Sequence, residues 1–144
     1  GTLPTPLIVG FGEAADLAAA GLGDEAARQV FLRDDLWAQL REGLPGIALN
    51  GAGAPRLAGG LNVCLPDGVR ALDVLEACPD VAASTGSACT AAEIAPSYVL
   101  TAMGLSAEKA SRCLRLSVGR STSKADIDRV ASLLIAAARA CQPN

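Results

Sequence analysis

Cys89 is the residue of this sequence best placed to react. It lies in the stretch Ser84–Ala91, in which every residue is small, so little side-chain bulk surrounds its sulfur. Gly86 adds backbone freedom to the same stretch. A thiol that attacks a substrate must be accessible as a thiolate, and an uncrowded segment provides that access. The residues alone leave one alternative open, a buried structural cysteine, because that is where a free cysteine usually lies in an apolar chain.

Arg115 is the second candidate. It lies in the run Leu114–Val118, where apolar residues alternate with other types and predict a strand. Arg115 and Ser117 then share the face opposite to the apolar one. A guanidinium suits the binding of a carboxylate, because its two N–H groups can meet both oxygens at once. From the residues alone, Arg115 could equally pair with Asp126 or Asp128.

Several other chemistries are disfavoured by composition and spacing. The sequence has no histidine, which removes Cys–His and Ser–His–Asp schemes and most metal sites from what this chain could do alone. Its five cysteines include no C-x-x-C pair, so neither a disulfide framework nor a zinc site is indicated. Gly10, Gly12 and Ala15 fit the G-x-G-x-x-A pattern of a dinucleotide-binding turn after an apolar triplet. No second strand–helix unit follows at the usual period, however.

The 144 residues are enough for one domain with a core, which must use Ala, Leu, Val and Ile because only 3% are aromatic. The mean hydropathy of +0.35 indicates either a surface covered by something outside this chain or simply many alanines. A net charge of −3 with scattered basic residues argues against nucleic-acid binding. We find no signal-peptide pattern and expect no apolar run able to cross a bilayer, hence no membrane association and a cytoplasmic location.

Hydrophobic periodicity and turn residues predict the order of elements. Pro4–Ala20 and Asp24–Glu42 are expected to be two helices, separated by Gly21–Gly23. The elements expected further along are strands at 47–49 and 61–65, a helix at 69–78, a strand at 81–84, short helices at 97–103 and 107–113, a strand at 114–118, and a final helix capped by Ser123. This order predicts an α+β fold, with a small, mostly antiparallel sheet and helices packed on one face.

Several stretches resemble the cysteine desulfurases of the NifS/IscS type, which belong to the class V aminotransferases of fold type I. The stretches are STGSACTA at 84–91, APSYVL at 95–100, LRLSVGR at 114–120, GTLP at 1–4 with IVG at 8–10 and GEA at 12–14, and Asn62-Val63. They follow in the family's order across nearly the whole chain. The resemblance implies that residues 1–144 form the small C-terminal domain of such an enzyme. An N-terminal helix would then lead to a cofactor domain elsewhere.

The resemblance also implies roles for three residues. Cys89 matches the nucleophile that takes sulfur from L-cysteine as a persulfide and leaves alanine, for uses such as iron-sulfur cluster assembly. Arg115 matches the arginine that binds the substrate carboxylate. Thr2 matches a threonine that reaches the phosphate of pyridoxal 5'-phosphate in the neighbouring subunit, which implies a homodimer in the complete enzyme. The implied partner is a sulfur-acceptor or scaffold protein.

Two departures from the family concern the cofactor. The family's cofactor lysine has no counterpart here, since Lys109 and Lys124 are the only lysines and neither lies in a matching motif. The histidine that stacks on the cofactor ring is also missing. We therefore expect a fragment that is inactive by itself. The alternative is a stand-alone thiol or persulfide carrier, or an interaction module, without pyridoxal phosphate chemistry.

Overall fold

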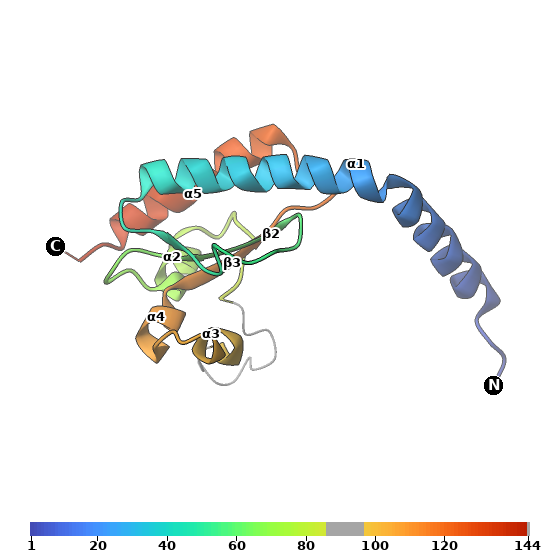
Figure 1. The fold of residues 1–144 in the computed structure, drawn as a ribbon, viewed down its shortest axis with the longest axis horizontal. Coiled ribbons are helices and arrows are strands. Elements are labelled where there is room, and N and C mark those ends of the chain that lie inside the picture. The colour runs from blue at the N-terminus through green and yellow to red at the C-terminus, as the bar shows by residue number, and fades with distance from the viewer. Residues whose placement is uncertain (86–96, 144) are drawn as a thin grey trace.

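A small antiparallel sheet is the centre of the fold, in a computed structural model that describes residues 1–85 and 97–143. Its strands are β1 (Ala48–Leu49), β2 (Gly60–Cys64) and β3 (Cys113–Ser117), in the order β1-β2-β3. The helices are α1 (Thr5–Gly43), α2 (Ala71–Ala77), α3 (Tyr98–Ala102), α4 (Ala107–Ser111) and α5 (Lys124–Ala140). This arrangement, drawn in Figure 1, confirms the predicted α+β class.

The main core lies between one face of the sheet and the two long helices. In α1, Leu32, Leu36 and Leu40 recur every four residues and are buried, which places one stripe of the helix against the sheet. The other buried members come mostly from β2, β3, α2 and α5, and they include Leu61, Val63, Leu114, Leu116, Val69, Val74, Ile127, Ala131, Leu134 and Ala138. Figure 1 shows α1 and α5 side by side above the sheet, and α3 and α4 below it.

The break predicted at Gly21–Gly23 is wrong, because α1 runs without interruption from Thr5 to Gly43. A glycine ends a helix when it adopts the left-handed conformation, and neither Gly21 nor Gly23 has a positive φ. Each glycine inside a helix costs only about 1 kcal/mol relative to alanine, which the surrounding helix can absorb. Figure 1 shows the two parts of α1 meeting at a bend, which is the common result of glycines in a helix.

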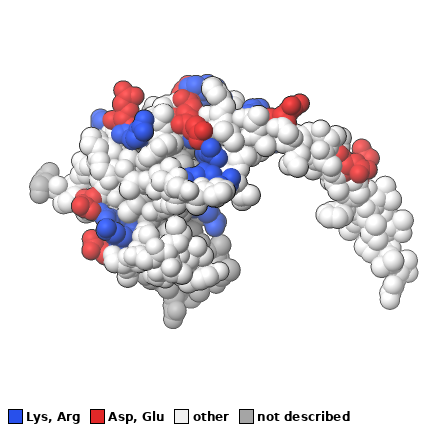
Figure 2. Space-filling view, viewed as in Figure 1, with Lys and Arg blue, Asp and Glu red and all other residues white. Residues whose placement is uncertain are grey.

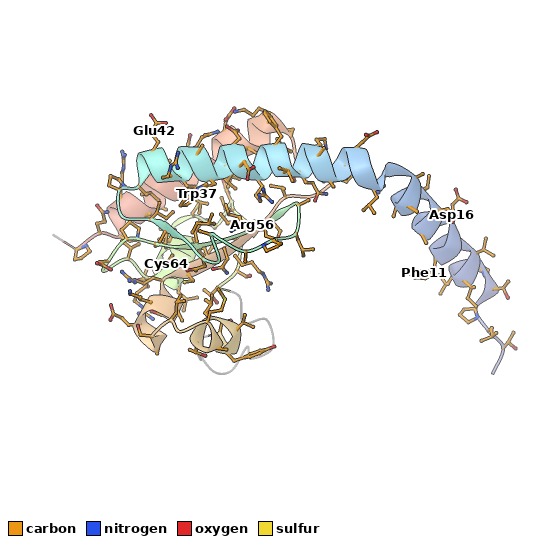
Figure 3. All side chains as sticks on the ribbon, in the orientation of Figure 1. Phe11, Asp16, Trp37, Glu42, Arg56 and Cys64 are labelled. Atoms are coloured by element: carbon orange, nitrogen blue, oxygen red, sulfur yellow. The ribbon has the colours of Figure 1, made fainter. Side chains whose placement is uncertain are left out.

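The N-terminal half of α1 extends away from the rest of the chain and is apolar. Leu7 and Phe11 are 73% and 78% exposed, and Phe11 projects with nothing against it in Figure 3. Figure 2 shows this half with few charged side chains. By length and composition α1 is able to cross a membrane, with an 18-residue window of hydropathy 1.2 that is 0% buried. The expectation that no segment passes that test is therefore wrong, because one long helix replaces the two short ones. A helix of a soluble protein passes the same test when another part of that protein packs against its apolar surface.

Two smaller predictions have different outcomes. Residues 81–84 do not form a strand, and only Ser84 makes an isolated bridge, to Arg115. The predicted cap of the last helix is confirmed. The Ser123 hydroxyl accepts a hydrogen bond from the N–H of Asp126 at 3.2 Å, while the carboxylate of Asp126 accepts one from the N–H of Ser123 at 2.8 Å. This reciprocal pair fixes where α5 begins after β3.

Candidate functional site

Arg115 lies on the face of the sheet opposite to the main core, as the alternation in β3 predicts. Leu114 and Leu116 are buried, whereas Arg115 and Ser117 are exposed. Asn62 of β2 is the register partner of Arg115 on one side. On the other side Ser84 forms the isolated bridge, in which the N–H of Arg115 donates to the Ser84 carbonyl at 2.7 Å. The backbone of Arg115 is therefore held from both sides, which fixes the direction in which its side chain leaves the sheet.

The guanidinium of Arg115 makes no ion pair with any residue in the described ranges 1–85 and 97–143. The two carboxylates considered as partners are engaged elsewhere. Asp126 accepts hydrogen bonds from Ser123, and Asp128 pairs with Lys124. The alternative of an Arg115–Asp pair is therefore wrong for both carboxylates, and among the residues that the structure describes the guanidinium has no anionic partner.

The stretch that contains Cys89 follows directly from this bridge. Ser84 lies two residues before residues 86–96, and α3 begins at Tyr98, just after them. Cys89 itself lies outside the described residues. The pairing of Ser84 with Arg115 nevertheless keeps the residues that lead into this stretch next to the arginine. The sequence had suggested a strand here, but one bridge is enough to bring the two segments together.

Thr2 is not brought near Arg115 within this chain. It is exposed and precedes α1, whose N-terminal end lies far from the sheet in Figure 1. The segment that follows the strand of Arg115 contacts α1 at Arg28, so the part of α1 from Thr5 to Arg28 extends beyond it towards Thr2. At about 1.5 Å per residue this part of the helix is roughly 35 Å long. Any joint role for Thr2 and Arg115 requires a second copy or another part of a protein, and the assignment of Thr2 stays a prediction.

The described residues do not by themselves fit pyridoxal phosphate. Lys109 and Lys124, the only two lysines, both lie on exposed helix surfaces. Hydrogen bonds from Lys124 to Asp128 and then to Asp35 raise the pKa of its amine, as expected for an ion pair on a helix surface. The expectation that the cofactor lysine lies outside residues 1–144 stays a prediction.

The dinucleotide-binding alternative is wrong. Gly10 and Gly12 both lie inside α1, and no strand precedes them. A dinucleotide-binding turn needs a strand, a tight glycine turn and the N-terminus of a helix, which together present free N–H groups to the pyrophosphate. In the middle of a helix the N–H groups near these glycines are hydrogen bonded to the helix itself, so they cannot serve a phosphate.

The sequence analysis missed the role of Arg28 in holding the turn between β3 and α5. Its guanidinium donates to the carbonyls of Thr122, Gly119 and Arg120 at 2.7, 2.8 and 2.9 Å. Glu25 orients it through an ion pair of 2.9 Å, and hydrogen bonding to Arg28 lowers the pKa of Glu25 to about 2. The spacing of Glu25 and Arg28, one helical turn apart, was the signal available in the sequence. The turn that follows the strand of Arg115 is thereby tied to α1.

Solved structures of other proteins have a similar fold. The structure is similar to the X-ray structure of a NifS-like protein from Rickettsia africae ESF-5, with a TM-score of 0.80 and 22% identity over 95% of this chain and 35% of that one. A second solved NifS-like protein gives a TM-score of 0.78. The fold is therefore that of the NifS-like proteins.

Sequence comparison identifies the family. The model of the aminotransferase class-V family matches residues 1–130, and the chain belongs to that family. It is 44% identical over 135 residues to cysteine desulfurase IscS of Anaeromyxobacter sp. (strain Fw109-5), and 42% identical over 134 residues to IscS of Shewanella baltica (strain OS155 / ATCC BAA-1091). These alignments cover 94% and 93% of this chain but only 33% of each relative, so the chain spans about a third of the length of the curated relatives it matches.

Proposed function

We propose that residues 1–144 are the C-terminal part of a cysteine desulfurase, an enzyme that removes sulfur from L-cysteine and leaves alanine. The observation that supports this most directly is the 44% identity to a cysteine desulfurase IscS over 94% of the chain. The exposed Arg115, whose backbone pairs with Ser84 two residues before residues 86–96, agrees with it, because the reaction needs both a carboxylate anchor and a thiol.

In this proposal the chain contributes two groups to the reaction. Arg115 binds the carboxylate of the amino acid through paired N–H donors, from a backbone position that β2 and Ser84 hold on both sides. Cys89 accepts the sulfur atom of the substrate and keeps it as a persulfide until an acceptor protein takes it. Thr2 binds the cofactor phosphate of the neighbouring subunit, which requires a homodimer.

The remaining parts of the active site belong to the rest of the enzyme. Pyridoxal phosphate supplies the electron sink in enzymes of this class, and its lysine would come from the portion outside this chain. The exposed apolar half of α1 supports such an arrangement, since a large uncovered apolar surface usually contacts another part of a protein. We place the complete enzyme in the cytoplasm, where its persulfide serves a sulfur acceptor such as a scaffold for iron-sulfur clusters.

The proposal is tested on the protein expressed from the complete reading frame that contains these residues. The assay measures the sulfide and alanine that this protein forms from L-cysteine in the presence of pyridoxal phosphate and a reductant. Cys89→Ala should abolish sulfide release. Arg115→Lys should raise the KM for L-cysteine about tenfold or more, because an ammonium cannot meet both carboxylate oxygens. Arg70→Lys is the matched control, since Arg70 is also exposed but lies at the start of α2, and its KM should not change.

Residues 1–144 alone, given pyridoxal phosphate and L-cysteine, should release no sulfide. An unchanged KM in Arg115→Lys, or sulfide release by Cys89→Ala, would contradict the assigned roles. If the complete reading frame binds no pyridoxal phosphate yet accepts sulfane sulfur on Cys89 from another desulfurase, the protein is a stand-alone persulfide carrier and the desulfurase proposal fails.

A further inference from the structure

Two cysteines that are far apart in the sequence lie opposite each other on neighbouring strands of the sheet. Cys64 ends β2, Cys113 begins β3, and the two are register partners. The next pair along the ladder is hydrogen bonded, because the N–H of Leu65 donates to the carbonyl of Arg112 at 3.0 Å. Since bonded and non-bonded pairs alternate, Cys64 and Cys113 form a non-hydrogen-bonded pair, the type in which opposing side chains lie closest.

This geometry suits a covalent link between the two sulfurs. The Cα atoms of such a pair are about 4.5 Å apart, inside the range of about 4.4–6.8 Å found for disulfides. Both thiols also lie against one carbonyl oxygen, that of Lys109, with Sγ–O distances of 3.6 Å for Cys64 and 3.2 Å for Cys113. The two sulfurs therefore occupy the same small pocket, and both cysteines are free in this structure.

The pocket lies below the sheet and is closed by α3 and α4. Leu100, Leu105 and Ala110 pack around the two cysteines, which are 7% and 0% exposed. Figure 3 shows Cys64 on the side of the sheet that faces α4. Of the two thiols, Cys64 is the one that keeps some exposure to solvent.

Arg112 adds an unusual polar group to this pocket. It is 5% exposed, pairs with Asp67, and its Nε has no hydrogen-bond partner within the described part of the chain. A buried unpaired donor costs free energy, and an anion nearby would relieve that cost. A second polar side chain, Asn50 just after β1, contacts one of the two sulfurs. Its amide donates a hydrogen bond to Cys113 Sγ at 3.1 Å.

A hydrogen bond and nearby positive charges favour the thiolate of Cys64. A hydrogen bond with Cys113, followed by the charges of Arg112 and Lys109, lowers the pKa of Cys64 to about 7 against the opposing effects of burial and Asp67. The hydrogen bond with Cys64 and burial raise the pKa of Cys113. Of the two thiols, Cys64 is therefore the one whose thiolate is favoured.

We propose that Cys64 and Cys113 form an oxidisable thiol pair that a hydroperoxide converts into a cross-strand disulfide. The Cys64 thiolate attacks one oxygen of hydrogen peroxide, the O–O bond breaks, and the departing hydroxide takes a proton and leaves as water. Cys113 then attacks the sulfenic acid sulfur, the S–S bond forms, and the hydroxyl leaves with the Cys113 proton as a second water. Two thiols lose two electrons and one peroxide gains them. The proposal is independent of the desulfurase function.

Tryptic mapping of the whole chain tests it, because the cleavage sites separate the relevant cysteines. Cys64 lies in the peptide 57–70, Cys113 in 113–115, Cys141 in 140–144, and Cys78 with Cys89 in 71–109. The reduced protein is treated with hydrogen peroxide, denatured, alkylated without reductant and digested. We expect peptide 57–70 joined to 113–115 and a loss of 2 Da from the pair. Recovery of both peptides as separate alkylated species, or Cys64 joined to 71–109 or 140–144, would overturn the proposal.

Variants separate the two chemical steps. In Cys113→Ser the sulfenic acid of Cys64 has no thiol to react with, so a dimedone adduct should appear on peptide 57–70. Cys141→Ser is the matched control, and it should give the linked peptides in the same yield as the unaltered chain. Cys89→Ala should also leave the link intact, since this thiol takes no part. A dimedone adduct that is equally abundant with and without Cys113 would show that Cys113 is not the resolving thiol.

Discussion

Gly59→Ala is predicted to destabilise the fold, because Gly59 lies where the chain entering β2 meets the end of β3. A Cβ at this position would lie 2.4 Å from the carbonyl oxygen of Val118 and 2.7 Å from Oε1 of Gln29. Gln29 can rotate away, but the carbonyl cannot. The N–H of Val118 donates to the Gly59 carbonyl at 3.0 Å, so relief of the clash must separate this backbone pair.

The cost of overpacking at such a contact is about 1–3 kcal/mol, a large part of a typical stability of about 5–15 kcal/mol. With a urea dependence of about 2 kcal/mol per molar, the unfolding midpoint should fall by roughly 0.5–1.5 M at an unchanged slope. The assay is urea unfolding of the whole chain followed by circular dichroism.

The neighbouring glycine provides the matched control. Among the described residues, the new Cβ in Gly60→Ala would meet Leu57 alone, at 3.6 Å from its Cβ and 3.7 Å from its carbonyl oxygen, which are ordinary contacts. That variant should be neutral or gain up to about 1 kcal/mol, because alanine lowers the entropy of the unfolded chain. A midpoint for Gly59→Ala equal to or above that of Gly60→Ala would refute the close approach.

Three further predictions concern the core, the last helix and acid stability. Leu114→Ala should cost about 2–5 kcal/mol in urea unfolding because the side chain is 1% exposed, whereas Leu57→Ala, at 84% exposure, should stay within about 0.5 kcal/mol of the parent. Ser123→Ala should lower stability by about 1 kcal/mol, measured by thermal melting, because it removes the side chain that caps α5. Hydrogen bonding to Arg28 holds the pKa of Glu25 at about 2, below its ordinary value of 4.5. The ionised Glu25 therefore contributes fully to the stability of the fold above pH 4.5, and this contribution is lost as the pH falls towards 2. Glu25→Gln should therefore flatten the decrease of the urea midpoint with acidification in that range, and an unchanged pH profile would contradict this.

Local sequence patterns were sufficient where the physical cause is local. The alternation around Arg115 predicted both the strand and the exposed face, because successive side chains of a strand point to opposite sides. The spacing of Ser123 and Asp126 predicted the cap of α5, because both hydrogen bonds form within one turn. The α+β class followed from the order of such elements.

Long-range contacts decided what these patterns could not. Gly21 and Gly23 carry a local signal for a helix end, yet the helix continues through them, since a glycine permits a break without requiring one. Residues 81–84 carry the apolar pattern of a strand, but a strand exists only through its partners, and Ser84 alone finds one.

The sequence by itself was sufficient to recognise the family motifs, to select Cys89, Arg115 and Thr2 as candidates, and to predict the local elements. Each of these depends on residues that are close together in the chain. Only the tertiary structure decided that Arg115 has no carboxylate partner among the described residues, that Arg28 holds the turn after β3, and that Cys64 lies opposite Cys113. The physical reason is the same in each case. Strand register and helix packing join residues tens of positions apart, and no periodicity along the chain encodes which of them will meet.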